Sequence, residues 1–141
     1  MKITKKKLLE ELNKDLEWEY AAAIQYLQHA AAIHGAEYDS IQKELMLHST
    51  EEMQHAVMLA DQIDFLGGVP TVDVEKREIS KDCVEMLKQD LWGEDNAIKR
   101  YKERIRQAEE LQEYGLRRVL EDILVQEEEH KRDIFNALAK K

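Results

Sequence analysis

The sequence has few of the residues that punctuate or cross-link a chain: one cysteine, one proline and five glycines in 141 residues. The single cysteine, Cys83, excludes an internal disulfide framework and any thiolate-based zinc or iron–sulfur site within one chain. So little proline and glycine leaves too few turns for a β fold. No apolar run approaches the length of a membrane span. We therefore expect an all-α protein without a membrane partner, located in a reducing cytoplasm.

The composition favours one helical domain over the whole chain, residues 1–141. Hydrophobic residues make up 43 %, which argues against disorder, and alanine, leucine, glutamate, lysine and glutamine are all strong helix formers. The formal net charge is −9, which argues against a nucleic-acid partner of the basic-patch kind.

Four segments carry apolar residues at alternating steps of three and four, the stripe of a helix that faces a bundle core. They predict helices over residues 5–34, 39–66, 81–112 and 115–140. Each stripe also contains acidic or imidazole side chains where leucine would be expected. These residues are Glu19 in the first segment, His48, Glu52 and His55 in the second, Glu94 in the third, and Glu127 and His130 in the fourth.

The connections between the segments predict the topology. Residues 34–39 and 112–116 are short and contain glycine, so each joins antiparallel neighbours. Residues 67–80 are long enough, at about 46–50 Å when extended, to run along a 28-residue helix of about 42 Å. Ser80 is the expected N-cap of the third helix, with Asp82 in its first turn. Two antiparallel hairpins joined by a long crossover form a ferritin-like four-helix bundle.

The two halves of the chain match at a constant offset in the numbering. Glu19 and Glu94 define it (94 − 19 = 75), and the same offset relates Glu52 to Glu127 and His55 to His130. The match indicates a duplicated helical hairpin. In each antiparallel hairpin the glutamates are nearly equidistant from the loop, so all six side chains are expected to converge near the middle of the bundle.

Six such side chains in a dry core need compensation, because buried carboxylates are costly and repel one another. Two divalent cations provide it, and carboxylate and imidazole groups suit iron or manganese equally. Residues three apart share a helix face, so Glu52 with His55, and Glu127 with His130, can bind one site. One glutamate from each of two helices and Glu-x-x-His from each of the others is a di-iron carboxylate pattern.

Four motifs resemble the bacterioferritin branch of the ferritin-like superfamily: WEYAAAIQYLQHA (18–30), EEMQHA (51–56), DLWGEDNAIKRY (90–101) and ILVQEEEH (123–130). The resemblance implies terminal metal ligands at Glu19 and Glu94. It implies bridging ligands at Glu52 and Glu127, completed by the two histidines. It also implies a ferroxidase, in which oxygen or peroxide oxidises Fe(II) at the dimetal centre and Fe(III) is stored or passed on.

The same resemblance bears on assembly and on haem. Bacterioferritins usually carry a short fifth helix, whereas this sequence ends at Lys141. This difference argues against a closed 24-subunit cage and leaves a dimer or another assembly as the alternative. Met53 matches the methionine that binds haem b across a two-fold interface. It points about 100° away from Glu52 on a helix, toward a neighbouring subunit. Packing at that interface is the alternative role of Met53.

Other residues near the six have open roles. Tyr26 and Tyr101 are hydrogen-bond donors to the ligands, electron sources or core tyrosines, and for Tyr101 we favour the core. Glu51 is either a carboxylate behind the ligands or surface charge. His48 either contributes to an ion path or is a histidine at the edge of the core. No role is assigned to His29 or His34, and Glu17, Glu128 and Glu129 are expected on solvated helix faces.

Two functions compete with iron oxidation and storage. A rubrerythrin-like peroxidase uses the same bundle, but this chain lacks the CxxC pairs of a rubredoxin domain and would need an external electron donor. A non-catalytic helical assembly module would only pair its stripe charges and would bind no stoichiometric metal.

Overall fold

The computed structural model describes residues 2–139, which form four long α-helices and one short 3-10 helix, with no strand in that range. The elements are α1 (Lys5–Ala32), η1 (Ala36–Tyr38), α2 (Asp39–Phe65), α3 (Cys83–Glu110) and α4 (Tyr114–Ala139). The predicted all-α class and four helices are confirmed. The predicted ends differ by up to two residues, and the predicted end of the fourth helix at 140 lies outside the described residues.

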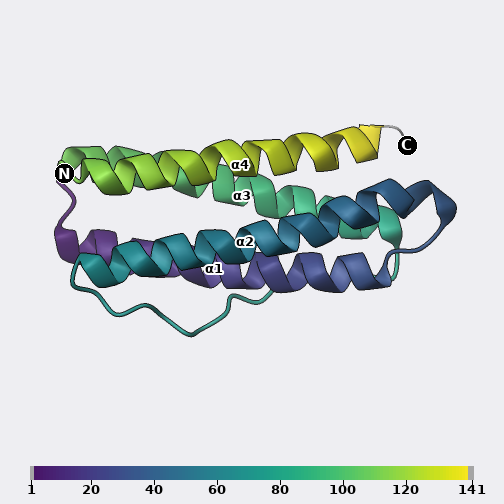
Figure 1. Ribbon diagram of the computed structural model, residues 1–141, viewed down its shortest axis with the longest axis horizontal. Helices are drawn as coiled ribbons and strands as arrows, with labels where there is room; N and C mark the ends of the chain where they lie inside the picture. Colours follow the sequence, from purple (N-terminus) through teal and green to yellow (C-terminus); the bar gives the residue numbers. More distant parts are fainter. Residues whose placement is uncertain (1, 140–141) are drawn as a thin grey trace.

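The helices form a bundle of two antiparallel hairpins, α1 with α2 and α3 with α4 (Figure 1). Across the hairpins, α1 contacts α3 and α2 contacts α4. The segment between α2 and α3 runs along the bundle, so α3 begins at the same end as α2 (Figure 1). The predicted ferritin-like topology with a long crossover is therefore confirmed. Within residues 2–139, no helix is both long enough and apolar enough to cross a membrane.

The two short connections reverse the chain by different means. At the first, Gly35 takes φ of 108°, a conformation that favours glycine. At the second, Gln112 takes φ of 60°, and the amide of Glu113 donates to the carbonyl of Ala108 at 2.9 Å. Gly115, the glycine that suggested this turn, lies instead in the first turn of α4. The turn was predicted correctly, but a non-glycine residue makes it.

The crossover is hydrogen-bonded to α1. The Thr71 amide donates to Asn13 Oδ1 at 2.9 Å, and the Tyr20 hydroxyl donates to the Thr71 carbonyl at 3.1 Å. At its end, Asp82 caps α3 by accepting from the amide of Glu85 at 2.9 Å. The prediction of Ser80 as the N-cap is wrong. Its hydroxyl accepts from the amide of Asp82 at 3.0 Å and so shapes the turn that precedes the cap.

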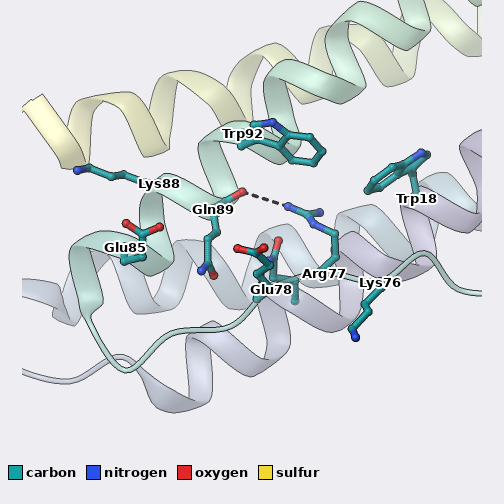
Figure 2. A pocket seen from close by; sticks show the side chains of 9 residues that line it. Trp18, Lys76, Arg77, Glu78, Glu85, Lys88, Gln89 and Trp92 are labelled. Carbon is teal, nitrogen blue, oxygen red and sulfur yellow. Dashed lines mark hydrogen bonds between the residues drawn. The ribbon is translucent and has the colours of Figure 1, made fainter.

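An arginine from the crossover joins α1 to α3. The Arg77 guanidinium lies between Trp18 and Trp92, 5.9 and 5.6 Å from their ring centroids, and donates to the Gln89 carbonyl at 3.0 Å (Figure 2). A Cβ atom at Gly93 would lie 2.5 Å from Arg77 Nη2, so the glycine leaves room for this contact. The contact favours one path for the crossover through cation–π attraction.

The buried apolar side chains form two separate clusters. One contains Leu8, Leu12, Leu16, Leu59, Ile63, Leu116, Leu120 and Ile123 among others. The second contains Ala30, Ile33, Ile41, Leu45, Met86, Leu87 and Ile134 among others. The polar stripe residues divide the apolar core, since each lies between leucine or isoleucine residues of the two clusters along its own helix. Apolar burial at both ends stabilises the bundle that holds these polar groups together.

Candidate metal centre

The structure brings six of the seven polar stripe residues together from all four helices, as their nearly equal distances from the loops predicted. We call this set the central cluster. Each side chain is at most 2 % exposed. Its members are Glu19 from α1, Glu52 and His55 from α2, Glu94 from α3, and Glu127 and His130 from α4.

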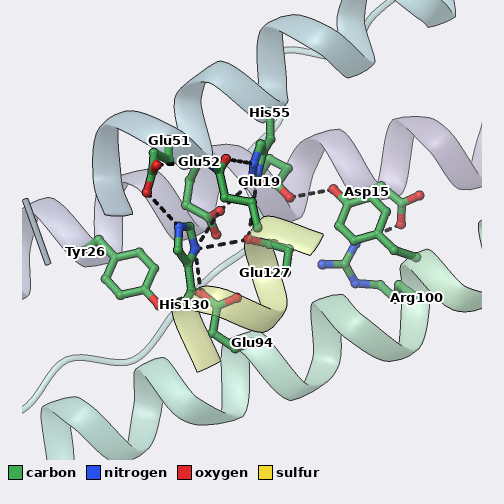
Figure 3. A network of polar contacts seen from close by, with 12 residues as sticks. Asp15, Glu19, Tyr26, Glu51, Glu52, His55, Glu94, Arg100, Glu127 and His130 are labelled. Carbon is green, nitrogen blue, oxygen red and sulfur yellow. Dashed lines mark hydrogen bonds and ion pairs between the residues drawn. The ribbon is translucent and has the colours of Figure 1, made fainter. Parts of the chain in front are cut away.

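The central cluster divides into two overlapping groups (Figure 3). One consists of Glu19, Glu52, His55 and Glu127, and the other of Glu52, Glu94, Glu127 and His130. In each group, one ligand-type atom from every residue lies within 4.8 Å of all the others. Glu52 and Glu127 belong to both groups, which is the arrangement that two bridging carboxylates require.

Each histidine directs Nδ1 into the cluster. His55 Nδ1 lies 3.1 Å from Glu52 Oε1 and 3.6 Å from Glu127 Oε1. His130 Nδ1 lies 3.2 Å from Glu127 Oε1 and 3.4 Å from Glu94 Oε2. Both Nδ1 atoms, both oxygens of Glu127 and one oxygen of each remaining glutamate make no hydrogen bond within residues 2–139. Buried polar atoms without hydrogen bonds are rare, and so many at one point fit a pair of cations bound by oxygen and nitrogen ligands.

The protonation of the central cluster reflects its crowding. Burial and the charge of Glu52 raise the pKa of Glu94 to about 7, and the same causes raise the pKa of Glu127 well above its usual range. Burial alone would lower the pKa of His55, but Glu19 and Glu52 outweigh it and raise that pKa to about 10. Protons therefore occupy the cluster when no other cation does.

Each tyrosine of the duplication reaches the opposite hairpin. The Tyr26 hydroxyl donates to Glu94 Oε2, and the Tyr101 hydroxyl donates to Glu19 Oε1, both at 2.5 Å. Both rings are also buried among apolar side chains. The favoured interpretation of Tyr101 as a core residue is therefore incomplete, because its hydroxyl also holds one carboxylate of the central cluster.

The outer nitrogens of the histidines are linked by two residues that precede the shared glutamates. Glu51 Oε1 lies 3.0 Å from His130 Nε2, and Gln126 Oε1 lies 2.5 Å from His55 Nε2. Gln126 Nε2 also donates to Glu51 Oε2 at 2.8 Å. Glu51 thus contacts the cluster from behind. The sequence analysis missed Gln126, although the offset between the two halves relates it to Glu51.

Two buried clusters of polar side chains flank the centre, and the sequence analysis assigned neither. Asp15 accepts from Arg104 Nε at 2.7 Å and from Arg100 Nη1 at 2.8 Å. His29 Nδ1 lies 2.8 Å from Asp90 Oδ1, and its side chain is fully buried. The offset between the halves relates the two aspartates to each other, and it also relates His29 to Arg104. That offset marks these positions as equivalent in the two halves, but it does not show which side chains contact each other.

The remaining sequence candidates lie outside the cluster. Met53 is 44 % exposed and lines a shallow apolar groove between α1 and α2, so it points away from Glu52 as expected. His48 is buried, and its ring stacks on that of His130 with centroids 4.0 Å apart. Burial is the main cause that lowers the pKa of His48 to about 4. His34 and Glu129 are exposed.

Comparison with known proteins shows the family and the fold of this chain. The family described as Ferritin, ferritin-like domain, matches residues 9–140. A bacterioferritin of Brucella melitensis is 33 % identical over 125 residues, which cover 88 % of this chain and 78 % of that protein.

Two solved structures share the fold over nearly the whole chain. One is described as ferritin like, diiron-carboxylate proteins from Bacillus anthracis; it has a TM-score of 0.92 at 34 % identity and covers 98 % of this chain and 99 % of its own. The other is a dodecameric thioferritin, a bacterioferritin-related protein from Bacteroides fragilis. It has a TM-score of 0.91 at 32 % identity, over 99 % of this chain and 88 % of its own.

Proposed function

The chain belongs to the ferritin family, as a ferritin-like domain, and on that premise we propose that it oxidises and stores iron. In this proposal, two iron ions bind at the central cluster, and oxygen or peroxide oxidises Fe(II) there. Fe(III) is then stored or passed on.

One observation carries the proposal: two groups of buried ligand atoms share Glu52 and Glu127. Without a cation, the four carboxylates at this point would repel one another, and the cluster would take up protons instead. Two divalent ions would balance the four carboxylates, with neutral histidines completing the coordination. The relatives called bacterioferritins and the diiron-carboxylate neighbour support iron as the metal.

Each residue has a distinct part in this function. Glu52 and Glu127 would hold both metal ions, Glu19 and Glu94 would hold one each, and His55 and His130 would each supply a nitrogen donor. Bound Fe(II) supplies the electrons that reduce the oxidant. The tyrosine hydroxyls on Glu19 and Glu94 orient those carboxylates, and Glu51 and Gln126 orient the imidazole rings through Nε2.

Anaerobic titration with Fe(II), followed by addition of oxygen or peroxide, tests the proposal. We expect two Fe(II) per chain in the native protein and a Fe(III) absorbance after the oxidant is added. The double variant Glu52→Ala with Glu127→Ala should lose both. Glu129→Ala, which removes an exposed carboxylate from the same helix, is the control and should retain both.

The outcomes separate the competing functions. Unchanged Fe(II) binding in the double variant would show that the site assignment is wrong. Rapid peroxide turnover with a reductant and no mineral growth would identify a peroxidase. Absence of stoichiometric metal in the native protein would leave a helical assembly module. Elemental analysis of the purified protein distinguishes iron from manganese, which the ligand types accept equally.

The proposal extends to assembly and cofactors. We infer a homo-oligomer, at least a dimer, from the apolar groove around Met53, where Ile24, Leu27 and Val57 are about half exposed. The thioferritin relative is a dodecamer. Haem b at Met53 and a cytoplasmic location stay predictions.

A further inference from the structure

A third group of metal-ligand residues lies outside the central cluster. Glu44 and His48 belong to α2 and Asp133 to α4; we call them the outer trio. His48 Nε2 lies 3.1 Å from Asp133 Oδ2, and one ligand-type atom from each of the three lies within 4.8 Å of the others. One imidazole and two carboxylates are a donor set that divalent first-row cations accept.

The outer trio runs from solvent to the interior. Glu44 is exposed, the Asp133 side chain is 43 % exposed, and the His48 side chain is only 1 % exposed. A surface pocket of about 500 Å³ has Glu44, Asp133 and Asn136 in its wall. A cation entering this pocket would meet the two carboxylates first and the imidazole last.

The buried end of the outer trio touches the central cluster. The His48 ring stacks on the His130 ring, with centroids 4.0 Å apart and 26° between the planes. The Tyr26 ring meets His48 edge-on at 5.0 Å. The imidazole of the outer trio therefore lies directly against an imidazole of the central cluster.

The duplicated half shows that packing does not require these polar residues. The positions that the offset relates to the outer trio are occupied by Val119, Ile123 and Met58. All three belong to the apolar cluster or pack against it. The bundle can thus fill this place with apolar side chains. Burial of a histidine costs free energy that an apolar residue avoids. The presence of the outer trio therefore needs an explanation other than packing.

We propose that Glu44, His48 and Asp133 form a third divalent-cation site, which receives the ion from solvent and passes it to His130 at one end of the central cluster. The transfer step rests on the proposed iron function, whereas binding at the outer trio does not. No bond other than metal–ligand bonds forms or breaks in this transfer, and the ion keeps its oxidation state.

Titration with Mn²⁺, with free Mn²⁺ counted by electron paramagnetic resonance, tests binding. We expect three ions per native chain and two in the double variant Glu44→Gln with Asp133→Asn. The double variant Glu121→Gln with Asp122→Asn removes the same charges from exposed positions of α4, about 16 Å from Asp133 along the helix, and should still bind three. Anomalous scattering from Mn²⁺-soaked crystals should place the third ion at the outer trio.

Stopped-flow oxidation of limiting Fe(II) tests the transfer. We expect a several-fold lower initial rate in the Glu44/Asp133 variant, with two Fe(II) still bound at the centre and a normal rate in the control. His48→Ile, which copies the residue at the duplicated position, should lose the third ion and show the same slow rate.

Different results would overturn the inference and the proposed function. Two Mn²⁺ at the centre and no peak at the outer trio would overturn the third site alone. An unchanged oxidation rate in the Glu44/Asp133 variant would overturn the transfer step. Mn²⁺ at the outer trio with none at the centre would instead overturn the proposed dimetal function.

Discussion

Two carboxylates of the central cluster are positioned by hydrogen bonds from tyrosines on other helices. Glu19 on α1 accepts from Tyr101 on α3, and Glu94 on α3 accepts from Tyr26 on α1. The exchange is symmetric, so each hairpin positions a carboxylate of the other. Hydrogen bonds to charged carboxylates are stronger than neutral ones and more directional than packing.

Removal of a single hydroxyl should weaken metal binding. In Tyr101→Phe, Glu19 loses its donor, and we expect a fall in cation affinity of about ten- to a hundred-fold, the usual effect of losing a group behind a ligand. Tyr26→Phe should do the same through Glu94. Co²⁺ titration followed by visible absorption measures this. Tyr20→Phe, which removes a hydroxyl bonded to the crossover, should bind normally, and equal loss in all three variants would contradict the role.

Metal binding should also release protons. Burial would lower the pKa of both cluster histidines, but the carboxylates outweigh it, so the pKa of His55 is raised to about 10 and that of His130 is raised further. At pH 7 both rings are protonated without metal, and each must lose a proton to bind one. We expect at least two protons released per chain, because the raised pKa values of Glu94 and Glu127 add to those of the histidines. Affinity should rise about tenfold per pH unit for each proton.

Isothermal titration of Mn²⁺ in two buffers of different ionisation enthalpy counts these protons. The Tyr20→Phe protein, whose cluster is intact, should release the same number. Binding that is independent of pH between 6 and 8, with no buffer-dependent heat, would contradict protonated histidines.

The ends of the helices are determined by local backbone geometry that the sequence reveals only partly. Gly67 after α2 has φ of 92° and Gly35 has φ of 108°, but the turn between α3 and α4 uses Gln112 at φ of 60°. A non-glycine residue in this region carries a steric cost. The nearby glycine, Gly115, lies inside a helix and has open space where a Cβ atom would be.

Substitution of these glycines should have opposite effects. Gly115→Ala should raise the free energy of unfolding by up to about 1 kcal/mol, because alanine favours a helix. Gly67→Ala should lower it by about 1 kcal/mol, because alanine disfavours positive φ. Urea unfolding of the metal-free proteins measures both. A loss of stability in Gly115→Ala would mean that this glycine, and not Gln112, makes the turn.

The whole molecule presents an apolar face on the α1–α2 hairpin that its own chain does not cover. Ile24, Leu27, Met53 and Val57 are each about half exposed along the groove between the two helices. Exposed apolar residues that gather on one face mark an interaction surface. In the proposed homo-oligomer, a second copy of the chain covers this face.

Charge on this face should prevent association. We expect the double variant Ile24→Lys with Val57→Lys to sediment as a smaller species than the native protein, because burying two ammonium groups in an apolar interface is costly. Val72→Lys with Val125→Lys, which places the same charges on exposed positions elsewhere, is the control. Analytical ultracentrifugation measures both, and unchanged sedimentation of the first variant would exclude this face as the interface.

Several features of the fold and candidate centre could be predicted without coordinates, and the misses have two different causes. Spacing of three and four along a helix located all six residues of the central cluster, because helix periodicity is local. The N-cap was placed at Ser80 instead of Asp82, since several polar residues near a helix start can serve. His29 was left without a role because its partner, Asp90, lies 61 residues away.

By itself, the sequence determined the helical class, the two hairpins and the identity of the six residues of the central cluster. Only the tertiary structure decided that Nδ1 of each histidine faces the cluster, that each tyrosine serves the opposite hairpin, and that Gln126 and Glu51 hold the outer nitrogens. The physical reason is distance along the chain. Periodicity depends on neighbours within one or two turns, whereas these contacts depend on how the helices are rotated against one another.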